Sequence, residues 1–456
     1  MHRPRPQRLA WLALLAGAAA CGARSQLVPG DGDGDGGGGP TSSSSSSTTT
    51  TTSGGGGGAG GDGGDGGAGG CSALTPLEIA TIAGGEGIHQ RKPALTFASG
   101  DAARVTLVSA WQVVEGPAVP PAELRHTTFE PWGDWPGGAA LGPTFLADLD
   151  AGTTFAAARA GDDRLALLFA DFQEPPAGGL RFSADFIPGT GDVPPSTLVH
   201  PGAQAAVFAV ESTDRHFVAA SSPTPTGGEL LELAVLDDGP LGGFSWYGCG
   251  LGPPKAAATP TATGAVFAFA TQPLGDCLVD PPAPPTDLWV GYVQESGFGA
   301  QYQVSEGAPI TDVGLAPRSG GAWVVWRADL NGSPRITAAR ASNSGILDGN
   351  LFLVTQPGDA PSPGTMAVAG FEDHLAVAWW QPQGVGGFLR VRLLAPDGSP
   401  AAESDIELDV PPGQSPAITG RPAFLGAPIG KSALLAWSQS LAEGDRLQLT
   451  RLDCLD

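Results

Sequence analysis

Basic residues are scarce in this sequence. Its 456 residues include 23 Lys and Arg against 46 Asp and Glu, and charged residues make up only 15% of the chain. The formal charge of −23 repels a phosphate backbone, so we expect no nucleic-acid partner. A hydrophobic content of 41% is sufficient for a core, while 70 Gly and 43 Pro disfavour long helices and favour a fold with many turns.

The local motifs of common catalytic and metal sites are also absent. The sequence has no HExxH pair, no GxxxxGK[ST] phosphate loop and no GxSxG nucleophile elbow, because GGFSWYG around Ser245 has the wrong spacing. The sialidase Asp-box is missing as well. Close acidic pairs such as Asp148 with Asp150 stand beside Gly-containing turns, where aspartate caps the backbone. We therefore expect no catalytic residue, no metal site and no cofactor.

No apolar run is long enough to cross a bilayer as a helix. The longest one near the N-terminus covers residues 9–20 and follows a basic segment, which predicts a signal peptide over residues 1–20. The residues Ala18, Ala19, Ala20 and Cys21 resemble a bacterial lipobox, which implies lipidation of Cys21. Gly22 follows the cysteine in place of the aspartate that marks inner-membrane retention, so we expect an address at the outer membrane or cell surface. An ordinary secretory signal without a lipid is the alternative.

The segment that follows has no large apolar side chain between Val28 and Cys71. Residues 30–70 consist almost wholly of Gly, Ser, Thr and Asp, a composition that cannot bury a core, so residues 21–74 are predicted to be a disordered tether. Its DGDGDG stretch resembles the start of a calcium loop, but Ser42 stands where an EF-hand needs glutamate. A polar linker is the better interpretation.

One type of short apolar run recurs through the rest of the chain at intervals of roughly fifty residues, as in repeat architectures. Each copy is bounded by turn residues, which is typical of a strand buried on both faces. The copies are RVTLVSAW (104–111), RLALLFADF (164–172), HFVAASS (216–222), AVFAFAT (265–271), AWVVWRA (322–328), LAVAWWQ (375–381) and SALLAWS (432–438).

Each copy stands among further predicted strands. A run of small residues precedes most copies, a more alternating run follows, and several units end in a fourth strand, for example ITDVGLA (310–316), PRITAARAS (334–342) and NLFLVT (350–355) around the fifth copy. Seven such units predict an all-β fold, a seven-bladed β-propeller over residues 75–456. Rings of six or eight blades and a pair of β-sandwiches are the alternatives.

The last unit ends after its third strand. The segment at residues 75–84 belongs to no other unit, so we expect it to complete the last blade and bring Cys71 close to Cys454. Four cysteines remain after Cys21, and this topology predicts two disulfides, Cys71 to Cys454 and Cys249 to Cys277. Free buried thiols are the alternative, and a four-cysteine zinc site is disfavoured because no CxxC pair exists.

A resemblance supports this architecture. Residues 309–347 and 364–402 resemble the degenerate β-propeller repeats of secreted lipoproteins found in myxobacteria and related Gram-negative bacteria, with an apolar run ending in Trp and a closing strand that leads into a Gly-containing turn. The resemblance implies the fold and a cell-envelope location, and it carries no catalytic residues.

Tryptophans fall into two groups. Trp326, Trp379, Trp380 and Trp437 recur at similar positions within their units, which predicts packing between blades. Other aromatic residues are predicted to lie in loops outside the repeating strands, where they could stack on sugar faces, anchor a partner or cover a blade edge. These candidate binding residues are Trp132, Trp135, Phe244, Trp246 and Tyr247.

Together these features predict a monomeric, envelope-anchored binding or scaffold module for a protein or a glycan, without catalysis. A propeller-fold glycan hydrolase or lyase is the alternative. Acidic side chains from several blades gathered at the channel mouth would distinguish such an enzyme from a binding module.

Overall fold

In the computed structural model, the described residues lie within one compact unit. The residues that the structure describes are 71–84, 88–98, 103–113, 122–133, 135, 144–149, 155–160, 164–170, 179–187, 197–201, 205–212, 215–223, 229–236, 240–248, 255–272, 284–294, 297–371, 373–384, 386–408, 417–427 and 431–455. None of them belongs to a helix long and apolar enough to cross a membrane.

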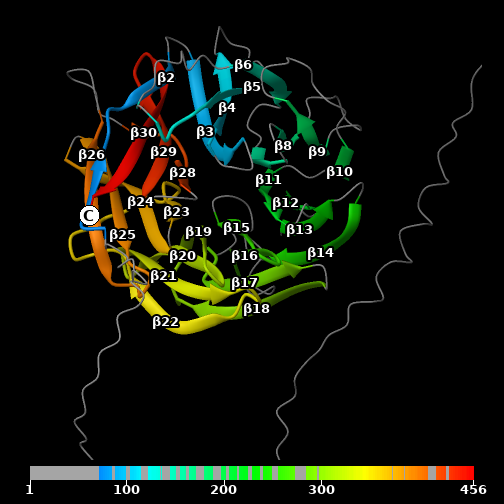
Figure 1. The fold of residues 1–456 in the computed structure, drawn as a ribbon. Coiled ribbons are helices and arrows are strands. Elements are labelled where there is room, and N and C mark those ends of the chain that lie inside the picture. The colour runs from blue at the N-terminus through cyan, green and yellow to red at the C-terminus, as the bar shows by residue number, and fades with distance from the viewer. Residues whose placement is uncertain are drawn as a thin grey trace, which may run out of the picture. The chain divides into compact units, whose positions relative to one another are not determined.

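The described residues form seven antiparallel sheets, numbered here as blades 1 to 7 (Figure 1). The strands of the first three blades are β3 (Ile88–Phe97), β4 (Val105–Val113), β5 (Ala122–Phe129) and β6 (Thr144–Leu149); β7 (Phe155–Arg159), β8 (Leu165–Ala170), β9 (Gly179–Phe186) and β10 (Thr197–Pro201); and β11 (Ala205–Ser212), β12 (Arg215–Pro223), β13 (Glu229–Leu236) and β14 (Pro240–Gly248).

The next three blades repeat the same four-strand order. Their strands are β15 (Ala256–Thr261), β16 (Gly264–Thr271), β17 (Asp287–Gln294) and β18 (Gly297–Ser305); β19 (Ile310–Arg318), β20 (Gly321–Leu330), β21 (Ser333–Ser342) and β22 (Leu347–Leu353); and β23 (Ala367–Phe371), β24 (His374–Gln383), β25 (Gly386–Leu394) and β26 (Pro400–Glu407).

Blade 7 is built from both ends of the described chain. It contains β27 (Ala417–Ile418), β28 (Ala423–Gly426), β29 (Ser432–Leu441) and β30 (Gly444–Leu455), and β1 (Ala73–Pro76) and β2 (Ala80–Gly84) both pair with β30. Leu74 lies opposite Cys454 in this pairing. β1 begins at Ala73, slightly before the predicted domain start at residue 75.

The first strands of neighbouring blades contact one another around a closed circle, from β3 through β7, β11, β15, β19 and β23 to β28 and back to β3. The blades therefore form a ring with these strands at its centre, as Figure 1 shows, and the seven-bladed β-propeller is confirmed. All seven recurring apolar runs lie on the second strand of their blade, one position outward from the channel.

Burial follows the position of each strand in its blade. The second strand β16 is buried throughout, because blades cover both of its faces, whereas the outermost strand β22 is mostly exposed. The recurring tryptophans fill the spaces between blades, since Trp326 packs among residues of blades 4 and 5, Trp379 of blades 5 and 6, and Trp437 of blades 6 and 7. Their predicted packing role is confirmed.

A disulfide joins Cys71 to Cys454, with Cα atoms 5.4 Å apart, as the sequence predicts. It covalently links the segment before β1 to the end of β30. The Cys249–Cys277 pairing and the lipidation site Cys21 lie outside the described residues and stay predictions.

Candidate functional site

The first strands enclose a central channel, and described residues line two cavities in it. The cavity at the end where these strands terminate has a volume of about 380 Å³ and is lined by residues of all seven blades. Small and apolar side chains dominate this lining, and its charged members within the described part of the chain are Arg159 and Glu211.

These two residues come from adjacent blades. Arg159 is the last residue of β7, and Glu211 lies near the end of β11, so the contact between these strands brings the two side chains together. Arg159 Nε donates to Glu211 Oε2 at 2.7 Å, and the pair is charge-neutral. His216 lies beside it, with Nε2 3.2 Å from the Arg159 carbonyl oxygen. Burial lowers the pKa of His216, against the opposing effects of this backbone contact and of Glu211.

The second cavity lies at the end where the first strands begin and has a volume of about 390 Å³. Its charged lining residues, within the described part of the chain, are Lys92 and Arg421. Burial lowers the pKa of the Arg421 guanidinium, and the negative charge of Asp312 opposes this lowering. The channel thus has a neutral ion pair toward one end and positive charge toward the other.

Sequence reasoning missed this positive end. The signal was present in the repeats, because KPALTF (92–97) of blade 1 and RPAFLG (421–426) of blade 7 align without gaps. Leu95–Phe97 and Phe424–Gly426 line the same cavity, and β3 contacts β28. The alignment therefore places Lys92 and Arg421 at equivalent positions in neighbouring blades, a relation that no catalytic motif contains.

Within the described part of the chain, no three His, Cys, Asp or Glu side chains gather closely enough to hold a metal ion. Acidic residues of several blades do not gather in either cavity. Among the described residues the two linings contain one carboxylate, that of Glu211 in the first cavity.

The loop with the two candidate tryptophans of blade 1 folds onto blade 7. Trp132 and Trp135 are half-buried and pack against the core that blades 1 and 7 share. Trp135 Nε1 donates to the Glu78 carbonyl oxygen at 2.7 Å, and Arg451 Nη1 donates to the carbonyl oxygens of Pro131 and Gly133 at 2.8 and 2.7 Å. These contacts favour the blade-covering interpretation of both tryptophans over ligand stacking.

The second aromatic group lies on a strand. Phe244, Trp246 and Tyr247 belong to β14, the outermost strand of blade 3, and lie opposite Leu233, Leu231 and Leu230 of β13. Their predicted position in a non-repeating loop is wrong, because this stretch has the alternation of an outer strand and continues the four-strand order of its blade. Their role in binding stays a prediction.

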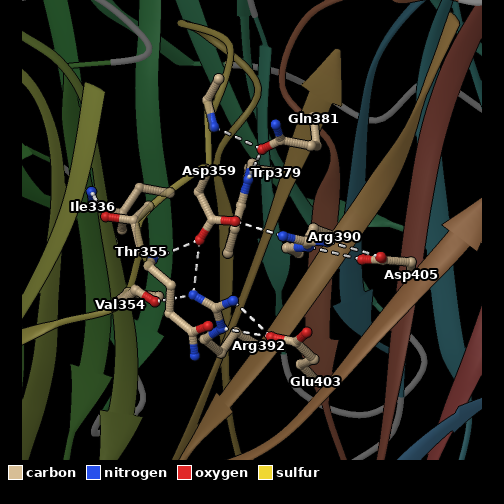
Figure 2. A network of polar contacts seen from close by, with 12 residues as sticks. Ile336, Val354, Thr355, Asp359, Trp379, Gln381, Arg390, Arg392, Glu403 and Asp405 are labelled. Atoms are coloured by element: carbon tan, nitrogen blue, oxygen red, sulfur yellow. Dashed lines mark hydrogen bonds and ion pairs between the residues drawn. The ribbon is translucent and has the colours of Figure 1, made fainter. Parts of the chain in front are cut away.

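A network of arginines and carboxylates connects blade 6 to the segment that enters it from blade 5 (Figure 2). Arg392 on β25 is only 2% exposed; its Nη1 donates to Asp359 Oδ2 at 2.9 Å and its Nη2 to Glu403 Oε2 at 2.6 Å. Arg390 pairs with the other oxygen of Asp359 and with Asp405.

Every carboxylate of this network has a guanidinium partner. For Asp359, burial raises the pKa, but the Gln356 backbone N–H, Arg392 and Arg390 together hold it below its usual value. The Arg392 guanidinium also lies over the Trp379 ring, 5.5 Å from its centroid. Because the donors and acceptors satisfy one another and fix the segment around Asp359 on blade 6, the network is structural.

No family model matches the sequence, and no curated protein matches it. Solved structures with a similar fold include a Penicillium chrysogenum α-L-arabinanase complexed with arabinobiose, with 12% identity, coverage of 83% of this chain and 99% of that one, and a TM-score of 0.45. A subtype N11 neuraminidase-like protein of the flat-faced bat strain H18N11 has 10% identity, coverage of 84% and 94%, and a TM-score of 0.44.

The β-propeller domain of the Trilobed protease from Pyrococcus furiosus is 9% identical over 81% of this chain and 98% of that one, with a TM-score of 0.43. Because these TM-scores lie below 0.5, the seven-bladed architecture rests on the strand pairing of this chain alone.

Proposed function

We propose that this protein is an exported, lipid-anchored β-propeller of the myxobacterial lipoprotein type that binds a protein or glycan of the cell envelope. Cys21 carries the lipid, residues 21–74 form the tether, and the propeller is held at the outer membrane or cell surface as a monomer. Loops of variable sequence on a rigid ring suit recognition.

The observation that carries binding over hydrolysis is the Arg159–Glu211 pair at the channel mouth. A glycosidase of the usual kind needs two carboxyl groups about 5–9.5 Å apart, one of them available as a proton donor. In the described lining Glu211 is the one carboxylate, and it accepts from Arg159 at 2.7 Å, so no second carboxyl group stands beside it there.

Binding and hydrolysis are separated by assaying one purified sample twice. The full chain, extracted from membranes in detergent, is tested on a panel of immobilised glycans and envelope proteins for retention, and on the same glycans for released reducing sugar. We expect retention without release, and retention altered in the charge-neutral double variant Arg159→Gln with Glu211→Gln. Release of reducing sugar that this variant abolishes would establish the hydrolase instead.

The anchor is tested by labelling cells with radioactive palmitate. The wild type should incorporate the label and fractionate with the outer membrane, whereas Cys21→Ala should incorporate none. Equal labelling of the two proteins would rule out Cys21 as the lipidated residue. An unlabelled wild type would indicate an ordinary secretory signal without a lipid.

A further inference from the structure

Positive charge gathers at one end of the channel of an otherwise acidic protein. The cavity of about 390 Å³ at this end takes residues from β3, β7, β11 and β15 and from the segments before β23 and β28. Its size lies within the range of roughly 300–1,000 Å³ that small-molecule sites occupy. Both charged residues of the described lining, Lys92 and Arg421, are cationic although the chain has a net charge of −23.

The Arg421 side chain leaves the start of blade 7 and reaches toward blade 5. A Cβ atom added at Gly314 would lie 3.0 Å from Arg421 Nη2 and 2.9 Å from Val368 Cγ2, so the guanidinium lies beside the first strands of blades 5 and 6. Glycine at position 314 leaves the space that the guanidinium needs. Part of the Arg421 surface stays open to the channel.

The guanidinium retains its hydrogen-bonding capacity. Among the described residues no hydrogen bond or ion pair joins Arg421 to another group, although the acidic Asp312 is near enough to interact with its charge. The carboxylate of Asp312 is fully buried and already accepts from the Gly364 and Met366 backbone N–H groups, at 2.9 and 3.4 Å. Asp312 therefore lies close to Arg421 without occupying its donors.

Lys92, the second cationic residue of the cavity, has an unusual backbone conformation in blade 1. Lys92 has a φ of 56°, in the left-handed region that costs a non-glycine residue about 1 kcal/mol or more. It lies in a bulge of the β3–β4 pairing between Arg91 and Ala94. Bulges re-aim side chains and are common beside functional sites.

The remaining lining is apolar. Pro93, Phe155, Val207 and Pro422 surround the two cations with side chains that offer no hydrogen bonds. A ligand that fits this cavity therefore has an anionic group for Arg421 and a hydrophobic body for the walls. The planar fork of a guanidinium matches the two oxygens of a carboxylate.

We propose that this end of the channel binds a small organic carboxylate, with Arg421 as the bidentate partner and Lys92 as the second positive charge. This site lies at the end of the channel opposite Arg159 and Glu211, so its ligand goes beyond the proposed function. Loss of the proposed carboxylate binding would leave retention of a glycan or protein at the other end unaffected, and the two proposals fail separately.

The proposal is tested by isothermal titration calorimetry on the full chain in low-salt buffer. The probes are benzoate, its neutral analogue benzamide, and inorganic phosphate. We expect benzoate to bind at one site per chain and at least tenfold more tightly than either other probe. No benzoate binding, equal binding of benzamide, or tighter binding of phosphate would each overturn the assignment.

Substitutions then locate the site. Arg421→Gln should weaken benzoate at least tenfold and Lys92→Gln severalfold, whereas Arg335→Gln, at an exposed position outside the cavity, should stay within twofold of the wild type. Circular dichroism verifies folding of each variant. If Arg421→Gln does not fold, Arg421→Lys, which keeps the charge and loses the fork, should still weaken benzoate severalfold. Unchanged benzoate affinity in a folded Arg421 variant would refute the proposal.

Discussion

Breaking the Cys71–Cys454 disulfide should destabilise the closed ring by an amount that follows from its position. The bond links residues 383 apart in sequence, so nearly the whole propeller lies within the loop it closes. The chain-entropy model gives about 6 kcal/mol for a loop of this length, and loss of a native disulfide typically costs about 2–5 kcal/mol. We expect a loss of about 2–5 kcal/mol rather than the larger value, because β1 and β2 still pair with β30 without the covalent bond.

The expected change in melting temperature depends on the size of the unit. Unfolding entropy of about 2.1 cal/mol/K per residue gives roughly 0.8 kcal/mol/K for roughly 390 residues, so a loss of about 2–5 kcal/mol corresponds to about 2–6 °C. The variant Cys71→Ser with Cys454→Ser, measured by calorimetry beside the wild type, provides this comparison.

The matched control lies at the same seam between the chain ends. Ser72→Ala removes only the exposed contact of Ser72 Oγ with the Leu455 carbonyl oxygen, 3.2 Å apart, and should shift the melting temperature by less than about 1 °C. Mass spectrometry of the non-reduced wild type should find Cys71 linked to Cys454. A double serine variant that melts with the wild type would refute the argument that this bond stabilises ring closure.

Three further variants test the packing and the electrostatics of the ring. Arg392→Met should cost about 3–5 kcal/mol in urea unfolding, because Asp359 loses a buried partner at 2.9 Å, and a loss no larger than that of the exposed Arg335→Gln would contradict the structural role of the network. Trp135→Phe should cost about 0.5–1.5 kcal/mol, since it removes the donor to Glu78 at the seam of blades 1 and 7 and keeps an aromatic ring; unchanged stability would reopen a ligand-stacking role. Burial lowers the pKa values of His126 and His216 in the folded state, so the unfolded state binds more protons and stability falls as the pH drops below about 6.5. The double variant His126→Gln with His216→Gln should show a flatter stability profile between pH 7 and 5, and an identical slope would contradict the assignment.

Repetition made the architecture readable from the sequence. The apolar runs around Trp326, Trp379 and Trp437 are buried on both faces, so solvent imposes no alternation on them, and they stand out in each unit as its second strand. The incomplete last unit and the unassigned segment before the first one also predicted which cysteines meet, because strand pairing fixes the neighbourhood of Cys71 and Cys454.

The candidate site depended on contacts that local sequence does not encode. Trp132 and Trp135 stand in a Pro/Gly-rich stretch like binding-loop aromatics, and only the packing of blade 1 on blade 7 shows that they cover a seam. The GGFSWYG stretch around Trp246 has the Gly-rich composition of a loop, yet pairing with β13 places Trp246 on an outer strand.

The sequence by itself determined the repeated strand order, the closure between the two ends and the positions of the interblade tryptophans, because these follow from local hydrophobic patterns and chain connectivity. Only the tertiary structure decided which side chains meet in the channel. Arg159 and Glu211 are 52 residues apart, and Lys92 and Arg421 come from opposite ends of the chain. Ring closure brings such residues together, and a local sequence pattern does not predict the distance between their side chains.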